Sequence, residues 1–368
     1  MYDHKVDPLG DVILSLRNPN NAPLILYDPL DDAAKPKTAK GDRRRPRASS
    51  HHPVDKPVTF LVSSRHLILA SPVFKAMLKG GWDEGNKKDG VFRIDAEDWD
   101  VMALTIVMDV LHSHYRQVPK WLTLKSLVKI AIIVDYYKLH EALQPMTLLW
   151  MKSIDPGLPI VSFRPDDVLR IFVSWVFGYA TAFTEITKAA ILWSEKDVEF
   201  PEGIPIPPAV VDRINQCRKE SFNAIATGLH GLQQDYTEGR EGCSFECSAM
   251  HLGALTKNMH DLNLSGHSPE TPFGDASLVE VVDRIKTMKP PIWHTLSSPG
   301  WYQDKRTWRQ HQCTSRGQSG AQGIESSIGN TTITKETSLA NLPALLSTAV
   351  KDKIEGLQLG DIKSDSGR

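Results

Sequence analysis

The stretch Ser63–Leu78, SSRHLILASPVFKAML, decides the fold of the region around it. Proline disfavours helical geometry at the preceding residue, so a helix through Arg65–Ala70 is predicted to end at Ser71. Ser71 can then cap a second helix, and Pro72 can open it without losing a hydrogen bond. The apolar residues of this second helix fall on one face: Val73, Phe74, Met77 and Leu78. The stretch therefore predicts two short helices joined at a Ser-Pro elbow, with the apolar face in the core.

The elbow resembles the first helices of the BTB/POZ domain, in the form found in filamentous fungi. The pattern Leu-x-x-x-Ser-x-x-Phe-x-x-Met is carried by Leu67, Ser71, Phe74 and Met77. Gly10–Leu14 looks like the opening strand of that family, with its leading Asp11. Val91–Leu111 looks like the strand and helix that follow, and Leu124–Leu139 like a later helix. The resemblance spans roughly residues 10–152 and implies an adaptor or scaffold that binds other proteins.

Two features of the family are not expected here. The strand-swapped homodimer needs a helix and strand ahead of Asp11, whereas Met1–Gly10 is short and interrupted by Pro8. Cullin-binding members carry a hydrophobic-x-Glu signature, and His112–Leu124 contains no Glu. The chain also has Ser63 and Ser64 where the family often has His-Lys, which alters the charged pocket that the family builds with Asp11.

The composition is that of an ordinary globular protein without a strong charge bias. Hydrophobic residues make up 41% of the 368 positions, charged residues 24%, and the net charge is -1. We therefore expect no nucleic-acid partner. The most apolar run, Ile171–Thr184, is too short to span a bilayer. Four cysteines and no signal peptide indicate an intracellular protein, in the cytoplasm or nucleus, without a disulfide framework.

A basic insertion interrupts the predicted strands. Asp11–Leu16 and Leu24–Tyr27 are predicted to pair as a hairpin, and Val58–Val62 resumes as a strand. Between them, residues 30–56 are basic and nearly free of apolar side chains, so we expect a disordered loop that is dispensable for folding. Its Arg43–Arg47 run has two interpretations, a nuclear-localisation or nucleic-acid segment and a solvated cationic loop, and we favour the loop.

The remaining chain is predicted to be mostly helical. The fold class is α+β, a small sheet with clustered helices, followed by an all-helical region and a disordered tail. We divide the chain into a tail (1–9), a BTB/POZ-like domain (10–155), a helical extension (160–312) and a mostly disordered tail (314–368) with one weak helix at Leu339–Val350. The helix after Asp167 is apolar enough to be buried on nearly all sides.

One set of residues has the chemistry of a zinc site. Cys243, Cys247 and His251 follow at four-residue spacing on a predicted helix, and His311-x-Cys313 comes later. Two such pairs could supply four zinc ligands. Structural zinc sites usually show tight pairs at both ends, so the alternative is that Cys243 and Cys247 are small buried residues and His311 a loop residue. We favour that alternative and expect no bound zinc.

No residues are predicted to be catalytic. The chain contains no nucleophile motif, no glycine-rich phosphate loop and no metalloprotease signature. His112 and His114 end a predicted helix, where the helix dipole suits a partly charged histidine. We therefore expect a non-catalytic protein–protein interaction module, with no cofactor. A nuclear transcription-associated factor using Arg43–Arg47 and an enzyme in the helical half are the alternatives.

Overall fold

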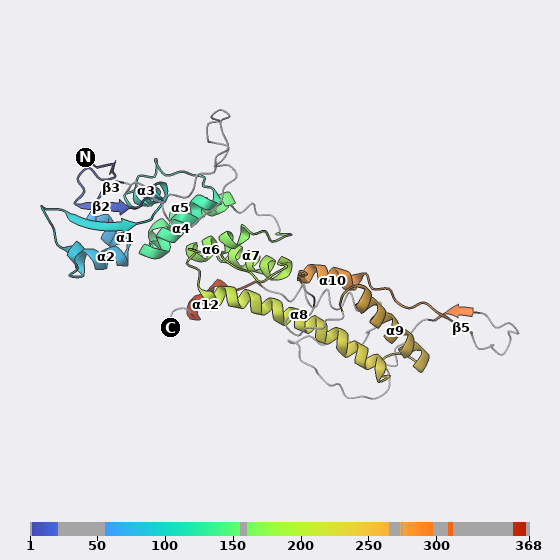
Figure 1. Ribbon diagram of the computed structural model, residues 1–368. Coiled ribbons are helices and arrows are strands. Elements are labelled where there is room, and N and C mark those ends of the chain that lie inside the picture. Colours follow the sequence, from blue (N-terminus) through green and yellow to red (C-terminus); the bar gives the residue numbers. More distant parts are fainter. Residues whose placement is uncertain are drawn as a thin grey trace, which may run out of the picture. The chain divides into compact units, whose positions relative to one another are not determined.

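The computed structural model describes residues 2–20, 56–154, 160–264, 273, 275–296, 308–311 and 356–365. The chain forms two compact units. The first comprises Met1–Ile186, Glu199–Pro208 and Gln358–Arg368, and the second comprises Thr187–Val198 and Ala209–Leu357. The helices and strands, most of which are labelled in Figure 1, make a mixed α/β protein, as the predicted α+β class requires.

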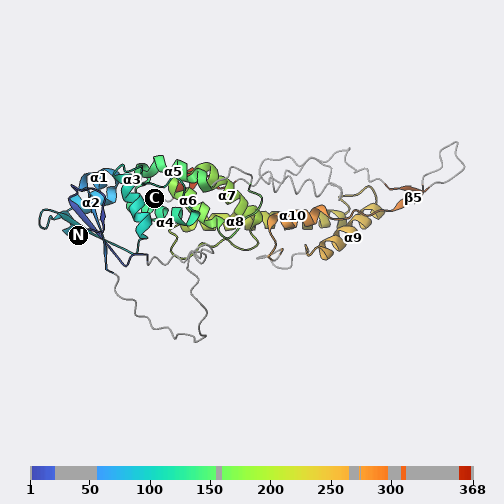
Figure 2. The ribbon, with the colours of Figure 1, turned by 90° about the horizontal axis from the view of Figure 1, so that it is seen from above.

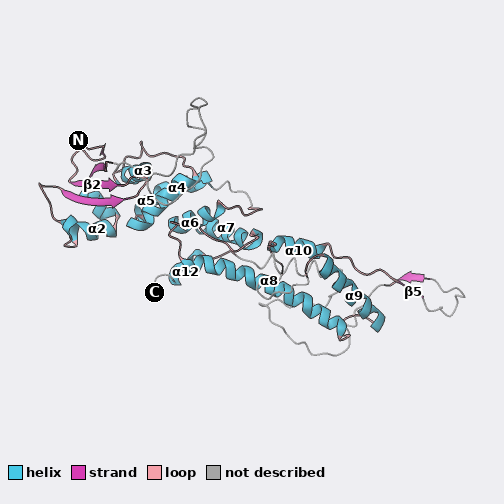
Figure 3. Ribbon diagram, in the orientation of Figure 1, coloured by secondary structure: helices cyan, strands magenta, loops and turns pink. Residues whose placement is uncertain are grey.

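A four-stranded sheet forms the first layer of the first unit (Figure 3). Its strands, in the spatial order β1-β3-β2-β4, are β1 (His4–Lys5), β3 (Val58–Val62), β2 (Val12–Arg17) and β4 (Phe92–Glu97). β2 pairs antiparallel with β3 and parallel with β4, so both of its edges are occupied. The predicted hairpin between Asp11–Leu16 and Leu24–Tyr27 is therefore wrong. Residues 24–27, like nearly all of the basic insertion at 30–56, lie outside the described residues.

The Ser-Pro elbow is confirmed. α1 (Ser64–Ala70) ends before Ser71, and α2 (Pro72–Lys79) begins after it. The Ser71 hydroxyl accepts a hydrogen bond from Phe74 N at 3.0 Å and donates one to the carbonyl of Tyr137 at 2.6 Å. Phe74 is fully buried, as predicted, and so is Leu67 of α1. The Phe74 ring stacks on Tyr137 with centroids 4.3 Å apart. One serine therefore caps a helix and ties the elbow to a distant segment.

Further helices of the first unit pack against one another, and the first two of them also contact the elbow helices (Figures 1 and 2). They are α3 (Val101–Leu111), α4 (Leu124–Tyr137), α5 (His140–Ile154) and α6 (Asp167–Phe177), with a short 3-10 turn, η1 (Asp83–Gly85), after α2. α6 packs on α4 and α5, and nearly all of its residues are buried, as its composition predicts. Because of this packing, the first unit continues past residue 155, the predicted end of the first domain.

The second unit is built on the long helix α8 (Pro208–Thr237), which buries Val210, Ile214, Phe222, Ile225 and Leu229 along one face. It also contains α9 (Phe245–Asp261) and α10 (Leu278–Lys286), and α7 (Ala180–Trp193) precedes α8 in the chain. The region is not all-helical, which corrects the prediction. β5 (His294–Leu296) and β6 (Trp308–Gln310) form a two-stranded antiparallel sheet. Each strand pairs over only three residues, and backbone hydrogen bonds between the strands, not a helical spacing of apolar residues, hold this part of the chain.

The end of the chain also departs from the predicted disordered tail. α12 (Leu359–Asp365) is a short helix, and Leu357, Leu359 and Ile362 are buried. The backbone N–H of Leu357 donates to the Thr187 hydroxyl at 2.9 Å. Three apolar side chains are too few to show a helical periodicity in the sequence. The segment is ordered because these side chains are buried in the tertiary structure. The predicted weak helix at Leu339–Val350 lies outside the described residues.

Candidate metal centre

The first two cysteines of the predicted set lie at the start of α9. Ser244 is the N-cap of this helix, and its hydroxyl accepts a hydrogen bond from Cys247 N at 3.2 Å. Cys247 is therefore in the first turn, whereas Cys243 lies in the loop just before the cap. This corrects the prediction that Cys243 and Cys247 share a helix face. The loop still carries the Cys243 thiol toward Cys247, because the chain turns sharply at the cap.

Gly242 makes this turn possible. Its φ is +96°, a left-handed conformation that side chains rarely adopt. A Cβ at this position would lie only 2.9 Å from the backbone nitrogen of Ser248. The Ser248 hydroxyl in turn donates to the carbonyl of Tyr236, which ties the start of α9 to the end of α8. The close packing of Gly242 against the backbone of Ser248 therefore fixes the position of the next residue, Cys243.

His311 reaches the same place from the β5–β6 sheet. The register pairs His294 with Gln310, so His311 lies beside Trp293, one residue before β5. Its backbone N–H donates to the Trp293 carbonyl at 2.8 Å. The two rings stack with centroids 4.3 Å apart and planes 17° apart. A backbone bond and a ring stack thus orient the imidazole, although Trp293 carried no signal in the sequence analysis.

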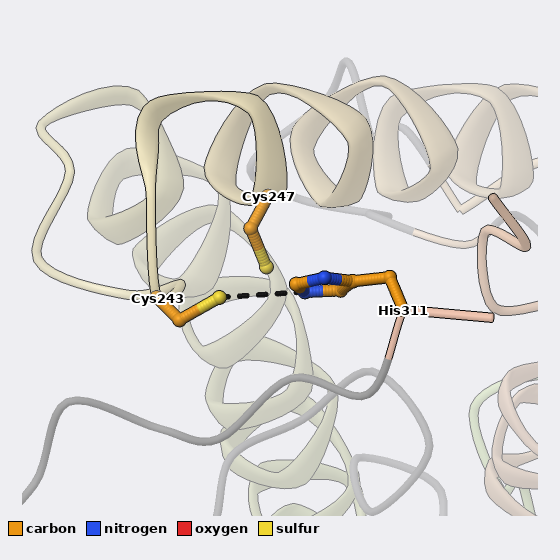
Figure 4. Close-up of side chains that lie close together, drawn as sticks. All are labelled: Cys243, Cys247 and His311. Carbon is orange, nitrogen blue, oxygen red and sulfur yellow. Dashed lines mark hydrogen bonds between the residues drawn. The ribbon is translucent and has the colours of Figure 1, made fainter. Parts of the chain in front are cut away.

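The three side chains converge (Figure 4). The two sulfurs and a ring nitrogen of His311 all lie within 4.8 Å of one another, and Cys243 Sγ is 3.3 Å from His311 Nε2. Cys247 is fully buried, and the other two residues are half-buried. The donor set is therefore two sulfurs and one imidazole nitrogen, which suits zinc. Cys313, the other predicted member of the set, lies outside the described residues.

His251, which follows the two cysteines at four-residue spacing on the predicted helix, is not part of this group. Its ring stacks on Tyr236, 5.4 Å away, and meets the Trp293 ring edge-on at 5.8 Å. Burial lowers the pKa of His251, and the nearby His311 lowers it further. Its Nδ1 is buried without a hydrogen-bond partner. His251 is thus a neutral ring that supports Trp293, which in turn supports His311.

The other histidine pair has a structural explanation that differs from the predicted one. His112 caps the end of α3, but it is buried, and burial lowers its pKa. Its Nδ1 lies 2.8 Å from the Met108 carbonyl, and Ser63 N donates to Nε2 at 2.9 Å. Both contacts fit a neutral imidazole, so the prediction of a partly charged histidine is wrong. Desolvation outweighs the helix dipole here.

The Asp11 carboxylate is held by Ser64, the first residue of α1. Ser64 donates both its backbone N–H and its hydroxyl to the Asp11 carboxylate, each at 2.9 Å. Lys87 lies 3.3 Å from the same carboxylate. Partial burial opposes ionisation, yet the Ser64 bonds and Lys87 together lower the pKa of Asp11. This arrangement joins the start of β2 to α1 and serves the fold.

Comparison with known proteins adds no further assignment. No family model matches the chain, and no curated protein sequence shows significant similarity to it. Among the helices that the structure describes, none has both the length and the apolar character needed to cross a bilayer.

Proposed function

We propose that the chain is a non-catalytic protein–protein interaction module, an adaptor or scaffold of the BTB/POZ kind. One observation carries the proposal. The first unit combines the Ser-Pro elbow with a sheet in which β2 pairs antiparallel with β3 and parallel with β4. This order of strands and helices, from β2 to α5, is the one that the resemblance in Leu67, Ser71, Phe74 and Met77 implies.

The surface of the first unit carries exposed large apolar side chains that are suited to a partner interface. Leu69 lies on α1 between the half-buried Ile68 and Ala70, and its own side chain is 88% exposed. Trp82, after α2, is 65% exposed. Large exposed apolar side chains are candidates for interfaces, where aromatic residues are enriched. Neither residue has a role in the core, so each can be changed without opening a cavity.

Self-association by strand exchange is not part of this proposal. β1 already pairs in parallel with β3 of its own chain, with His4 opposite Phe60 and Lys5 opposite Leu61. The backbone N–H groups of Val6 and Asp7 donate to the Leu61 carbonyl. These bonds cover the outer edge of β3 at the place where an exchanged strand would add. Cullin binding is likewise not proposed, because its signature is absent from His112–Leu124.

Quantitative affinity purification of the full chain tests the proposal. We expect stoichiometric protein partners that are lost from the double variant Leu69→Glu, Trp82→Glu. The matched control is Phe245→Glu, which changes an equally exposed apolar residue (84%) in the second unit and should retain those partners. Circular dichroism establishes that each variant is folded. Absence of any stoichiometric partner, or loss only from the Phe245 variant, contradicts the proposal.

A further inference from the structure

The second unit holds a set of side chains that its packing alone does not explain. We propose that Cys243, Cys247 and His311 bind one zinc ion, which links the start of α9 to the β5–β6 sheet. The inference is independent of the proposed interaction function. It also replaces the expectation of no zinc, which came from the lack of tight ligand pairs at both ends of the set in the sequence. The fold brings Cys243, Cys247 and His311 together without such pairs.

The geometry fits tetrahedral coordination. With Zn–S near 2.3 Å and Zn–N near 2.0 Å, neighbouring ligand atoms of a tetrahedral site lie about 3.5–3.8 Å apart. The three atoms here lie within 4.8 Å of one another, and one pair is already at 3.3 Å. Small rotations about the side-chain bonds therefore close the site. The fourth position is left for a water molecule or a further donor.

Each ligand is aimed by a separate feature that requires no metal. The left-handed turn at Gly242 directs Cys243, and the Ser244 cap places Cys247 in the first turn of α9. His311 is held by its backbone bond to Trp293 and by the stack on that ring. Three independent constraints that lead to one point indicate a preorganised site.

The chemistry of these side chains also favours a bound cation. Thiols are weak hydrogen-bond donors, so the contact between Cys243 and His311 stabilises the metal-free arrangement little. When zinc binds, each thiol releases its proton to solvent, two Zn–S bonds and one Zn–N bond form, and no electron is transferred. The two thiolates cancel the charge of the ion. A neutral centre can then sit beside the fully buried Cys247 without the cost of a buried net charge.

Zinc would give the small sheet a stable attachment. β5 and β6 pair over only three residues each, and an isolated two-stranded sheet is at best marginally stable in water. A metal that joins its His311 end to α9 closes a long loop and stabilises the folded state by its binding free energy. The metal is therefore expected to have a structural role.

Metal analysis of the full chain, purified under reducing conditions, tests the inference. We expect about one zinc per chain. Cys243→Ser and His311→Gln should each weaken zinc binding by more than the roughly 10- to 100-fold that loss of an outer-shell partner costs. Cys217→Ser is the matched control, because this half-buried thiol lies on α8 outside the cluster, and it should retain zinc.

A second measurement keeps the test decisive if a ligand variant fails to fold. Cobalt added to the metal-free wild-type chain should give thiolate-to-cobalt charge-transfer absorption and the visible bands of a tetrahedral site, and zinc should abolish both. Three results overturn the inference: no zinc bound after incubation with zinc and reductant, equal zinc in Cys243→Ser and wild type, or octahedral cobalt without thiolate absorption.

Discussion

The backbone N–H of Ser63 donates a hydrogen bond to Nε2 of His112, 49 residues later, at 2.9 Å. Ser63 precedes α1 without a side-chain capping bond, and His112 ends α3. The bond therefore joins the entrance of the elbow to the end of a helix from another part of the first unit. It requires a neutral ring, since a protonated Nε2 carries a hydrogen and cannot accept.

This bond predicts loss of stability in mild acid. The folded state lowers the pKa of His112 below its ordinary value of 6.5, mainly by burial. Above pH 6.5 the ring is neutral in both states and the stabilisation is complete. As the pH falls below 6.5, the unfolded chain takes up the proton first, so the free energy of unfolding decreases. The melting temperature should therefore fall between pH 7.5 and pH 5.5, before most carboxylates titrate.

The variant His112→Gln isolates this contribution. Its side-chain oxygen can accept a hydrogen bond but cannot take up a proton, so the melting temperature should depend less on pH than in the wild type. His251, whose pKa is also lowered, remains in both proteins and cancels in the comparison. Identical pH profiles for the two proteins would show that His112 is not the titrating group.

A second prediction concerns Ser71. Ser71→Ala removes the cap of α2, worth about 0.5–2 kcal/mol, and leaves the Tyr137 carbonyl without its hydroxyl donor, at about 1–3 kcal/mol. Thr123→Ala is the matched control, because Thr123 caps α4 through Ser126 N but lies at the surface. Denaturant unfolding should show a larger loss for Ser71→Ala. Equal losses would mean that the bond to Tyr137 contributes nothing measurable.

A third prediction concerns the glycine before the metal site. Gly242→Ala should lower the affinity for zinc, because the new Cβ collides with the backbone of Ser248 and displaces Cys243. Gly239 is the control. It also has a positive φ, +71°, but open space surrounds the position of its Cβ. Gly239→Ala should cost only backbone strain, about 1–2 kcal/mol, and retain zinc in competition with a chelator. Parallel loss of zinc in both variants would contradict the role given to Gly242.

A fourth prediction is that β1 does not exchange between two copies of the chain. Because β1 pairs with β3 of its own chain, and His4 stacks on Phe60 at 4.6 Å, deletion of residues 2–7 should leave the association state unchanged. Light scattering at micromolar concentration measures this state, and circular dichroism shows that the shortened chain is folded. A dimer that is present in the full chain and disappears on this deletion would refute the prediction.

The sequence predicted most elements of the fold but only part of the candidate site. The burial of α6 and the apolar face of α8 follow from regular spacing along one helix, so they could be identified without coordinates. Arg218 on α8 was missed, although it continues the same face between Ile214 and Phe222. It is buried because its guanidinium donates to Asp197 and to the Ser194 carbonyl. The burial of a charged residue can be predicted only when the groups that pair with it in the folded protein are known.

The candidate site shows the same limit. Cys243, Cys247 and His311 were identified by residue type, while His251 was grouped with them by helical spacing. Spacing could not reveal that Trp293 would lie between His251 and His311, because that contact depends on the register of β5 and β6.

By itself, the sequence determined the Ser-Pro elbow and the long amphipathic helices, because these depend on neighbours within a few residues and on backbone preferences that act locally. Only the tertiary structure decided three other features: which strands flank β2, the neutral state of His112, and the meeting of two thiols with an imidazole 64 residues away from Cys247. Each depends on which surfaces pack together, since pairing, desolvation and metal-ligand geometry arise between segments that are distant in the chain.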